Sequence, residues 1–359
     1  MFRGCVLAKA AADFVPEADQ ADGCPRPRDV YSLVGHAHEE AKFASMFNNN
    51  TLHHAWLLNG PTGIGKATLA YRMIRRVLGG VPQTEGALDI PQSDPVAQRI
   101  QSLGHGDFLL VRRPYDQKTK KLRAEIPITE ARKISNFFSR KASEGGWRVC
   151  LIDSIDEMNR NATNAVLKTL EEPPEKALLI LLSNAPGRLL PTIRSRCLSL
   201  PLRPVDDIEL RTWLAARTNA DKQDVEAAVY LANGAPGKAF AYVQNAESVL
   251  RPLGRFFRGF PRQNPQLLHS ISDTLALVKN KVSHDLFWDG LHSTLHAQAV
   301  YAATGEWSGA FEPIALQRTP DTWVKIRNEL DQMRLAGAGL NMNKKNVLLQ
   351  GLIQIGAAI

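Results

Sequence analysis

Hydrophobic and polar positions follow two different periods in the first two hundred residues. Apolar residues at helical spacing predict helices at 67–79, 128–142 and 161–172. Short, nearly continuous apolar runs predict buried strands at 55–59, 108–111, 147–153 and 177–184, with a further strand near 193–200. Apolar strands that alternate with amphipathic helices indicate a parallel sheet covered by helices on both faces.

The pattern changes after Pro204, where helical periodicity continues without a convincing strand. We therefore predict an α/β nucleotide-type domain at 30–203, a small helical module at 204–254 and an all-helical domain at 255–359. In the first 29 residues, Lys9 interrupts a short apolar stretch and acidic residues follow it. We interpret 1–29 as a flexible tail rather than a secretory signal.

Composition narrows the class of protein. The 359 residues suffice for two or three domains, and 44% hydrophobic with 22% charged residues is typical of soluble globular chains. The net charge of +8 permits a polyanionic partner such as DNA without requiring one. We expect no membrane span, because no window of about 18 apolar residues occurs. The cysteines are too scattered for a disulfide framework, and a reducing cytoplasm is the simplest setting: Cys5, Cys24, Cys150 and Cys197.

A phosphate-binding loop is the first chemical motif. GPTGIGKA, residues 60–67, has the spacing G-x-x-x-x-G-K and lies between a predicted strand and a predicted helix, as the motif requires. Gly60, Gly63 and Gly65 let the backbone N–H groups approach phosphate oxygens, and the helix N-terminus favours the anion. Lys66 would neutralise the β and γ phosphates. We expect the loop to bind the phosphates of ATP or ADP.

The loop lacks one group that hydrolysis requires. Ala67 stands where hydrolysing enzymes have the hydroxyl that ligates magnesium. Thr68 cannot replace it, because one step along a helix turns a side chain by about 100°.

A second group is missing at the end of the strand 147–153. Asp153 occupies the position of a magnesium-holding carboxylate, but Ser154 follows it where many such enzymes have a glutamate that polarises water. We interpret Asp156 and Glu157 as acids at a helix N-terminus. Nucleotide binding is therefore expected to be weak or vestigial, without efficient turnover.

A long ordered signature identifies a family resemblance. The segment IDSIDEMNRNATNAVLKTLEEPPEKALLILLSNAPGRLLPTIRSRC (152–197) resembles the clamp-loader branch of the AAA+ ATPases. The segment GHAHEEAKFASMFNNNTLHHAWLLNGPTGIGKATLAYR (35–72) is similar to the delta-prime subunits of bacterial DNA polymerase III clamp loaders. The resemblance covers 31 to about 245 strongly and the helical remainder weakly.

The resemblance implies roles for three residues. Arg196, in the Ser-Arg-Cys triplet, would reach into the ATP site of a neighbouring subunit; the alternative is a solvated or salt-bridged arginine. Asn184 matches the sensor 1 position, which orients water or the γ phosphate, or else it is structural. Lys238, in GAPGKA, stands at the sensor 2 position, where it offers charge but not the bidentate fork of an arginine.

The chain departs from the family at the zinc module that such subunits commonly carry. Residues 67–149 contain no cysteine, and His105 alone cannot complete a tetrahedral zinc site. We predict no metal.

The resemblance further implies a function and partners. It implies a P-loop (AAA+) α/β domain, a helical lid and a C-terminal collar domain in a stator-like subunit of the DNA-directed DNA polymerase III holoenzyme. The expected partners are the gamma/tau and delta subunits in a hetero-pentamer, and through them the sliding clamp and primed DNA, in the cytoplasm. Two alternatives stay open: an active gamma/tau-type ATPase, and a DNA-binding scaffold with a relic fold.

Two further segments carry open alternatives. The basic run KTKKLR (118–123) is either a contact for a DNA backbone or a solvated loop. The aromatic segment RFFRGF (255–260) is either a base-stacking surface or a linker that packs against the collar.

Overall fold

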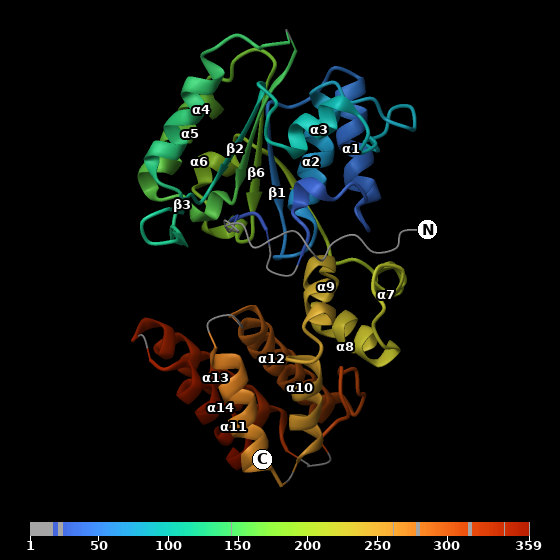
Figure 1. Cartoon of the computed structure of the whole chain (residues 1–359), viewed down its shortest axis with the longest axis vertical. Helices are drawn as coiled ribbons and strands as arrows, with labels where there is room; N and C mark the ends of the chain where they lie inside the picture. The colour runs from blue at the N-terminus through green and yellow to red at the C-terminus, as the bar shows by residue number, and fades with distance from the viewer. Residues whose placement is uncertain are drawn as a thin grey trace. The chain divides into compact units, whose positions relative to one another are not determined.

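The computed structural model describes residues 17–20, 24–144, 146–260, 262–277, 281–314, 318–340 and 342–358. The chain forms two compact units that divide between Arg203 and Pro204 (Figure 1). That division coincides with the change of pattern in the sequence. Each unit is described by itself.

The first unit is built on a five-stranded parallel sheet with the order β2-β5-β6-β1-β7. The strands are β1 (Ala55–Asn59), β2 (Phe108–Arg112), β5 (Arg148–Asp153), β6 (Ala177–Ser183) and β7 (Leu198–Pro201). Strands β1, β2, β5 and β6 lie within one residue of the predicted apolar runs. Strand β7 begins five residues after the start of the predicted run 193–200, because residues 191–194 form the short helix α6. The predicted parallel α/β P-loop fold is confirmed.

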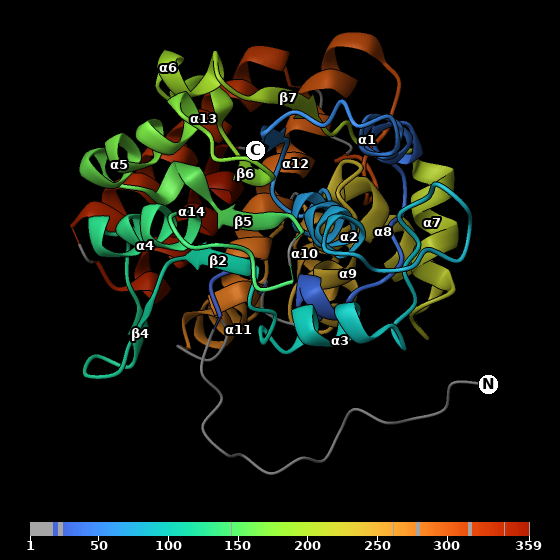
Figure 2. The same ribbon diagram turned by 90° about the horizontal axis from the view of Figure 1, so that it is seen from above.

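Helices cover both faces of this sheet. On one face α1 (Ala37–Asn48), α2 (Lys66–Val77) and α3 (Pro95–Gln101) pack on alternate strand residues such as Trp56 and Ile180. On the other, α4 (Ile128–Phe138) and α5 (Arg160–Glu171) pack on the intervening residues, such as Leu57 and Leu179 (Figure 2). The short helices are η1 (Pro27–Asp29), η2 (Ile155–Glu157), η3 (Pro186–Arg188) and α6 (Pro191–Arg194).

Helix α4 ends four residues before the predicted end at 142. Arg148, at the start of β5, stacks over the Phe137 ring at 3.9 Å and donates hydrogen bonds to the carbonyls of Phe137 and Arg140. These bonds satisfy carbonyl groups that a continued helix would have used, so the chain leaves the helix here.

The basic run forms a hairpin rather than a plain loop. Strand β3 (Tyr115–Asp116) pairs with the antiparallel strand β4 (Lys121–Leu122), and Asp116 Oδ1 accepts hydrogen bonds from the backbone N–H groups of Lys118 and Thr119. The basic side chains of the run are exposed, and the hairpin extends outward from the unit (Figure 2). Whether it contacts DNA stays a prediction.

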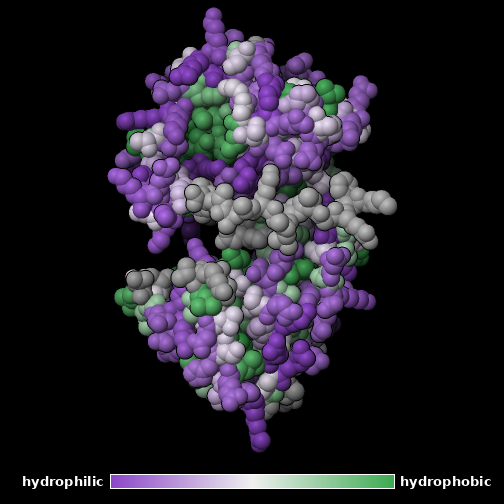
Figure 3. Space-filling view, in the orientation of Figure 1, coloured by the Kyte–Doolittle hydropathy of each residue, from purple (hydrophilic) through white to green (hydrophobic). Residues whose placement is uncertain are grey.

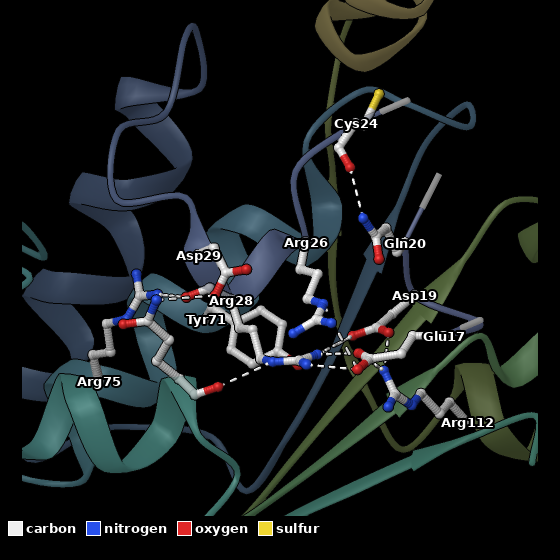
Figure 4. A network of polar contacts seen from close by, with 11 residues as sticks. Glu17, Asp19, Gln20, Cys24, Arg26, Arg28, Asp29, Tyr71, Arg75 and Arg112 are labelled. Atoms are coloured by element: carbon white, nitrogen blue, oxygen red, sulfur yellow. Dashed lines mark hydrogen bonds and ion pairs between the residues drawn. The ribbon is translucent and has the colours of Figure 1, made fainter. Parts of the chain in front are cut away.

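The flexible tail predicted for 1–29 is wrong for the part that the structure describes; residues 1–16 and 21–23 lie outside it. Glu17 pairs with Arg28 and with Arg112 at the end of β2, and Asp19 pairs with Arg112 and lies 3.4 Å from the Tyr71 hydroxyl (Figure 4). Ion pairs with residues almost a hundred positions away therefore fix this segment to the sheet domain.

The second unit is entirely helical among its described residues. Its helices are α7 (Asp207–Ala215), α8 (Lys222–Ala232), α9 (Pro236–Gln244), α10 (Leu250–Arg258), α11 (Pro265–Ala276), α12 (Lys281–Thr304), α13 (Pro320–Gly339) and α14 (Lys344–Ala358). Fully buried aromatic side chains form its core: Tyr242, Phe256, Phe287, Trp288 and Trp323. The division into lid and collar stays a prediction, and the boundary placed at 254/255 falls inside the unbroken helix α10.

The base-stacking interpretation of RFFRGF is wrong for its two helical phenylalanines. Phe256 and Phe257 are buried on α10, and the Phe257 ring stacks on Phe311 with 6.1 Å between centroids. These rings are part of the core of the second unit and are not available to a nucleobase.

The surface of each unit and the character of its helices match a core that is buried within the unit. Hydrophilic residues cover most of the face of each unit that Figure 3 shows. Of the helices in the described residues, none combines the length and the apolar character that crossing a membrane would need.

Candidate functional site

The candidate site lies at the carboxyl edge of the parallel sheet, where ligands of open α/β sheets bind. The phosphate loop follows β1, Asp153 ends β5 and Asn184 follows β6. Because β6 pairs with both β1 and β5, the register brings these three positions to neighbouring strand ends. The structure thus brings together the loop glycines, Lys66, Asp153 and Asn184, as the sequence predicts.

The loop requires glycine at its two ends. Gly60 has a φ of 153°, and a Cβ there would lie 2.9 Å from the carbonyl oxygen of Leu202. Gly65 has a φ of 110° and occupies the N-cap of α2. Gly63 between them also has a positive φ, of 82°. This backbone fits a phosphate cradle at a helix N-terminus.

Lys66 points back into the loop. Its Nζ donates hydrogen bonds to the carbonyls of Gly60 (2.8 Å) and Pro61 (2.9 Å) and to Asn184 Oδ1 (2.8 Å). Burial lowers the pKa of the ammonium to about 8, although the charges of Asp153 and Asp156 oppose that change. At neutral pH Lys66 still carries most of its charge.

Asp153 lies in acidic surroundings. The pKa of its carboxyl is raised to about 7, first by burial and then by the charges of Asp19 and Glu157, while Lys66 and Arg112 act in the opposite direction. Within the described part of the chain its carboxylate makes no hydrogen bond or ion pair. The carboxylate is therefore available to ligate a magnesium ion opposite the loop.

Helix α2 supplies no second magnesium ligand at position 67, where a hydroxyl is expected. Ala67 is partly buried and packs against the apolar core of the sheet domain. The residues present fit a phosphate group, but the magnesium ligand set is reduced.

Asp156 lies in the first turn of a short helix, as predicted, but its hydrogen bonds also make it a functional candidate. It lies in η2, not at the N-terminus of α5, which Asn159 caps. Asp156 Oδ2 accepts from Ser154 Oγ (2.8 Å) and from the backbone N–H of Asn184 (2.5 Å), and Oδ1 accepts from Ser183 Oγ (2.8 Å). The sequence feature that could have predicted this network is the presence of polar residues at the ends of two neighbouring apolar strands.

Glu157 lies in the first turn of the same short helix, η2, as the interpretation of a helix N-terminal acid expects. It forms an ion pair with Arg113 Nε at 2.8 Å, and burial raises the pKa of its carboxyl.

Arg196 lies away from the phosphate loop, between α6 and the amino end of β7. Its Nη2 pairs with Glu171 Oε1 at 3.0 Å and its Nη1 donates to the Thr192 carbonyl at 3.1 Å. More than a third of the Arg196 side chain and about half of Glu171 are exposed. The structure thus places this cation at the surface, beside the end of α5.

The family model described as "DNA polymerase III, delta subunit" matches residues 35–206. The delta-prime subunit of DNA polymerase III from Pseudomonas aeruginosa is 29% identical over 284 residues, which are 74% of this chain and 82% of the relative. The tau/gamma subunit from Haemophilus influenzae is 30% identical over 191 residues, 53% of this chain.

These matches support a delta-prime-like member of the clamp-loader family of DNA polymerase III subunits. The match spans only 26% of the length of the Haemophilus influenzae tau/gamma subunit. A gamma-subunit-related protein of DNA polymerase III from Thermotoga maritima is 16% identical, with 89% of this chain and 99% of that chain covered at a TM-score of 0.48.

Lys238, the residue predicted for the sensor 2 position, lies in the second unit. Lys238 lies in the first turn of α9, and its Nζ pairs with Asp289 Oδ2 on α12 at 3.0 Å. The Tyr242 ring centroid lies 5.9 Å from the same ammonium. A contact between Lys238 and nucleotide stays a prediction.

The predicted absence of zinc also stays a prediction. Over the described ranges, no three His, Cys, Asp or Glu side chains lie together as a metal site would require. His105 is buried, where its Nδ1 accepts from the Asp107 backbone N–H at 3.2 Å.

Proposed function

We propose that this chain is a delta-prime-like clamp-loader subunit that supplies Arg196 in trans to the ATP site of a neighbouring subunit and turns over little or no ATP itself. One observation carries the proposal: the guanidinium is exposed, at the opposite sheet edge from the chain's own phosphate loop. Its partner Glu171 is also exposed. Such pairs contribute roughly 0–1 kcal/mol, so the guanidinium can exchange Glu171 for a phosphate at little cost.

The proposed chemistry is electrostatic. A guanidinium brought in from a neighbour offsets charge on the γ phosphate during its transfer, and such residues raise turnover by about three to five decades. The planar donor fork of Arg196 suits phosphate oxygens better than an ammonium would. This role requires no hydrolysis by the chain that supplies the arginine.

The chain's own site supports the second half of the proposal. Ala67 offers no magnesium ligand, and the single hydroxyl hydrogen of Ser154 is shared between Asp156 Oδ2 (2.8 Å) and the Leu182 carbonyl (3.0 Å). A hydroxyl used as a donor does not act as a general base. ATP or ADP would bind weakly through the loop glycines and Lys66.

The proposed partners are the gamma/tau and delta subunits in a hetero-pentamer that loads the sliding clamp onto primed DNA in the cytoplasm. Exposed apolar residues on the last two helices support a subunit interface in the C-terminal unit, as a collar would need. They are Val324, Leu335 and Ile353.

Two assays test the proposal. The purified chain alone should hydrolyse ATP far more slowly than about one per second. Adding it to gamma/tau and delta subunits should raise their ATP hydrolysis in the presence of clamp and primed DNA. Rapid turnover by the isolated chain would instead support an active gamma/tau-type ATPase, which the tau/gamma relatives favour as the second candidate.

A DNA-binding scaffold is the third candidate, favoured by the exposed basic hairpin at 115–123. It predicts salt-sensitive DNA binding by the isolated chain. Our proposal expects such binding to be feeble until the other subunits are present.

A further inference from the structure

A continuous set of hydrogen bonds connects Asp156 to the phosphate loop. Asp156 fixes the backbone N–H of Asn184, and Asn184 Oδ1 in turn accepts from Lys66 Nζ (2.8 Å) and from Thr62 Oγ1 (3.2 Å). The connection therefore runs from η2, across the end of β6, to the lysine that would meet phosphate.

Lys66 uses all of its hydrogen-bond donors within the protein. An ammonium has three hydrogens, and Lys66 donates to three oxygens, two of them carbonyls of its own loop. To contact a phosphate, Lys66 must give up one or more of these bonds. The oxygen of Asn184 is the acceptor among them that depends on another residue for its position.

Asp156 is well suited to hold that position. Ser183 is fully buried and Ser154 nearly so, and both donate to the Asp156 carboxylate. Buried hydroxyls rarely lack partners, so these bonds hold the carboxylate in place beneath Asn184. An ionised glutamate at position 154 would have no hydrogen to donate to Asp156. Ser154 therefore leaves the site without a general base and at the same time donates a hydrogen bond that holds the Asp156 carboxylate.

We propose that Asp156 is a positioning residue that, through Asn184, keeps Lys66 bonded to its own loop and thereby lowers the affinity of this clamp-loader chain for nucleotide phosphates. The carboxylate acts in the same direction through its charge, which repels phosphate. This role concerns the chain's own loop and does not depend on any function of Arg196.

The test is ATP binding by the full chain with Asp156→Asn, measured by calorimetric titration without magnesium, so that Asp153 takes no part as a metal ligand. Asparagine keeps the shape of Asp156 but removes the charge and one acceptor. We expect ATP to bind about tenfold more tightly than to the wild-type chain, since one charged hydrogen bond no longer competes for Lys66.

Glu157→Gln is the matched control. It removes the same charge one residue away, but Glu157 pairs with Arg113 and makes no contact with Asn184. It should tighten ATP binding much less than Asp156→Asn. Asn184→Ala should reproduce the gain, and in that background Asp156→Asn should add no more than Glu157→Gln does.

A second measurement distinguishes the proposed positioning role of Asp156 from a role in stability alone. Amide hydrogen exchange of residues 60–66 should speed up in Asp156→Asn and not in Glu157→Gln, with the thermal unfolding of both variants recorded. An Asp156→Asn chain that folds but binds ATP no more tightly than the wild type or Glu157→Gln would overturn the proposal. So would equal loop exchange in the two variants.

Discussion

Arg196 and Lys66 lie at opposite edges of the same parallel sheet. Lys66 follows the carboxyl end of β1, whereas Arg196 precedes the amino end of β7, the parallel neighbour of β1. The register pairs Leu198 with Trp56 and Pro201 with Asn59, so about 15 Å of strand separates the backbone of Arg196 from the loop. This separation supports the proposal that Arg196 serves a site on another molecule.

Ala67→Thr tests whether the missing hydroxyl is the reason for weak magnesium-dependent binding. A threonine at this position begins α2 with an oxygen beside the phosphates, so magnesium should tighten ATP binding in the variant by about tenfold or more. Hydrolysis should stay slow, because Ser154 still supplies no carboxylate. The measurement is ATP affinity with and without magnesium in variant and wild type; Thr68→Ser, on the next position, should leave both values unchanged.

The raised pKa of Asp153 predicts a pH-dependent cost in stability. Because its folded pKa of about 7 lies above its ordinary value of 3.8, the folded chain binds more protons than the unfolded chain between these values. Stability contributed by this group is therefore lost as pH rises through 7. Asp153→Asn removes this cost. Its gain in free energy of unfolding over the wild type should therefore be larger at pH 8 than at pH 5, by on the order of 2 kcal/mol.

Denaturant unfolding at the two pH values measures that difference. Asp116→Asn is the control, because turn N–H groups lower the pKa of the partly exposed Asp116 carboxyl, which stays ionised at both pH values. A gain for Asp153→Asn that is the same at pH 5 and pH 8 would contradict the assignment.

Arg112→Met tests the attachment of the N-terminal segment. Arg112 pairs with Asp19, whose side chain is fully buried, so its removal leaves a buried carboxylate with its main counter-ion gone. Such losses cost about 3–5 kcal/mol. The free energy of unfolding should fall by an amount in that range, and residues 17–20 should become accessible to protease. Arg123→Met, which removes an arginine that is about half exposed, should cost less than about 1 kcal/mol.

Local pattern was enough to predict the strands, the phosphate loop and the place of Asp153. Each depends on apolar runs or on a motif within a few residues, and the register of a parallel sheet then brings Asp153 and Asn184 beside the loop. Most of the candidate site could therefore be predicted from the sequence alone.

The attachment of Glu17 and the role of Asp156 could not be predicted in the same way. Glu17 is fixed by Arg112, which lies far along the chain, and a short polar segment has no periodicity that would reveal such a partner. Asp156 resembles a helix-terminal acid in sequence, and only the course of the chain after β6 turns the Asn184 backbone toward it.

The most direct test of the account is the rate of ATP hydrolysis by the reconstituted clamp loader carrying Arg196→Ala, with clamp and primed DNA present. Arg194→Ala, an exposed arginine two residues earlier, is the matched control. We predict normal assembly with hydrolysis at the adjoining site reduced by about three decades or more for Arg196→Ala, and no change for Arg194→Ala. Unchanged hydrolysis in an intact assembly with Arg196→Ala would contradict the trans role.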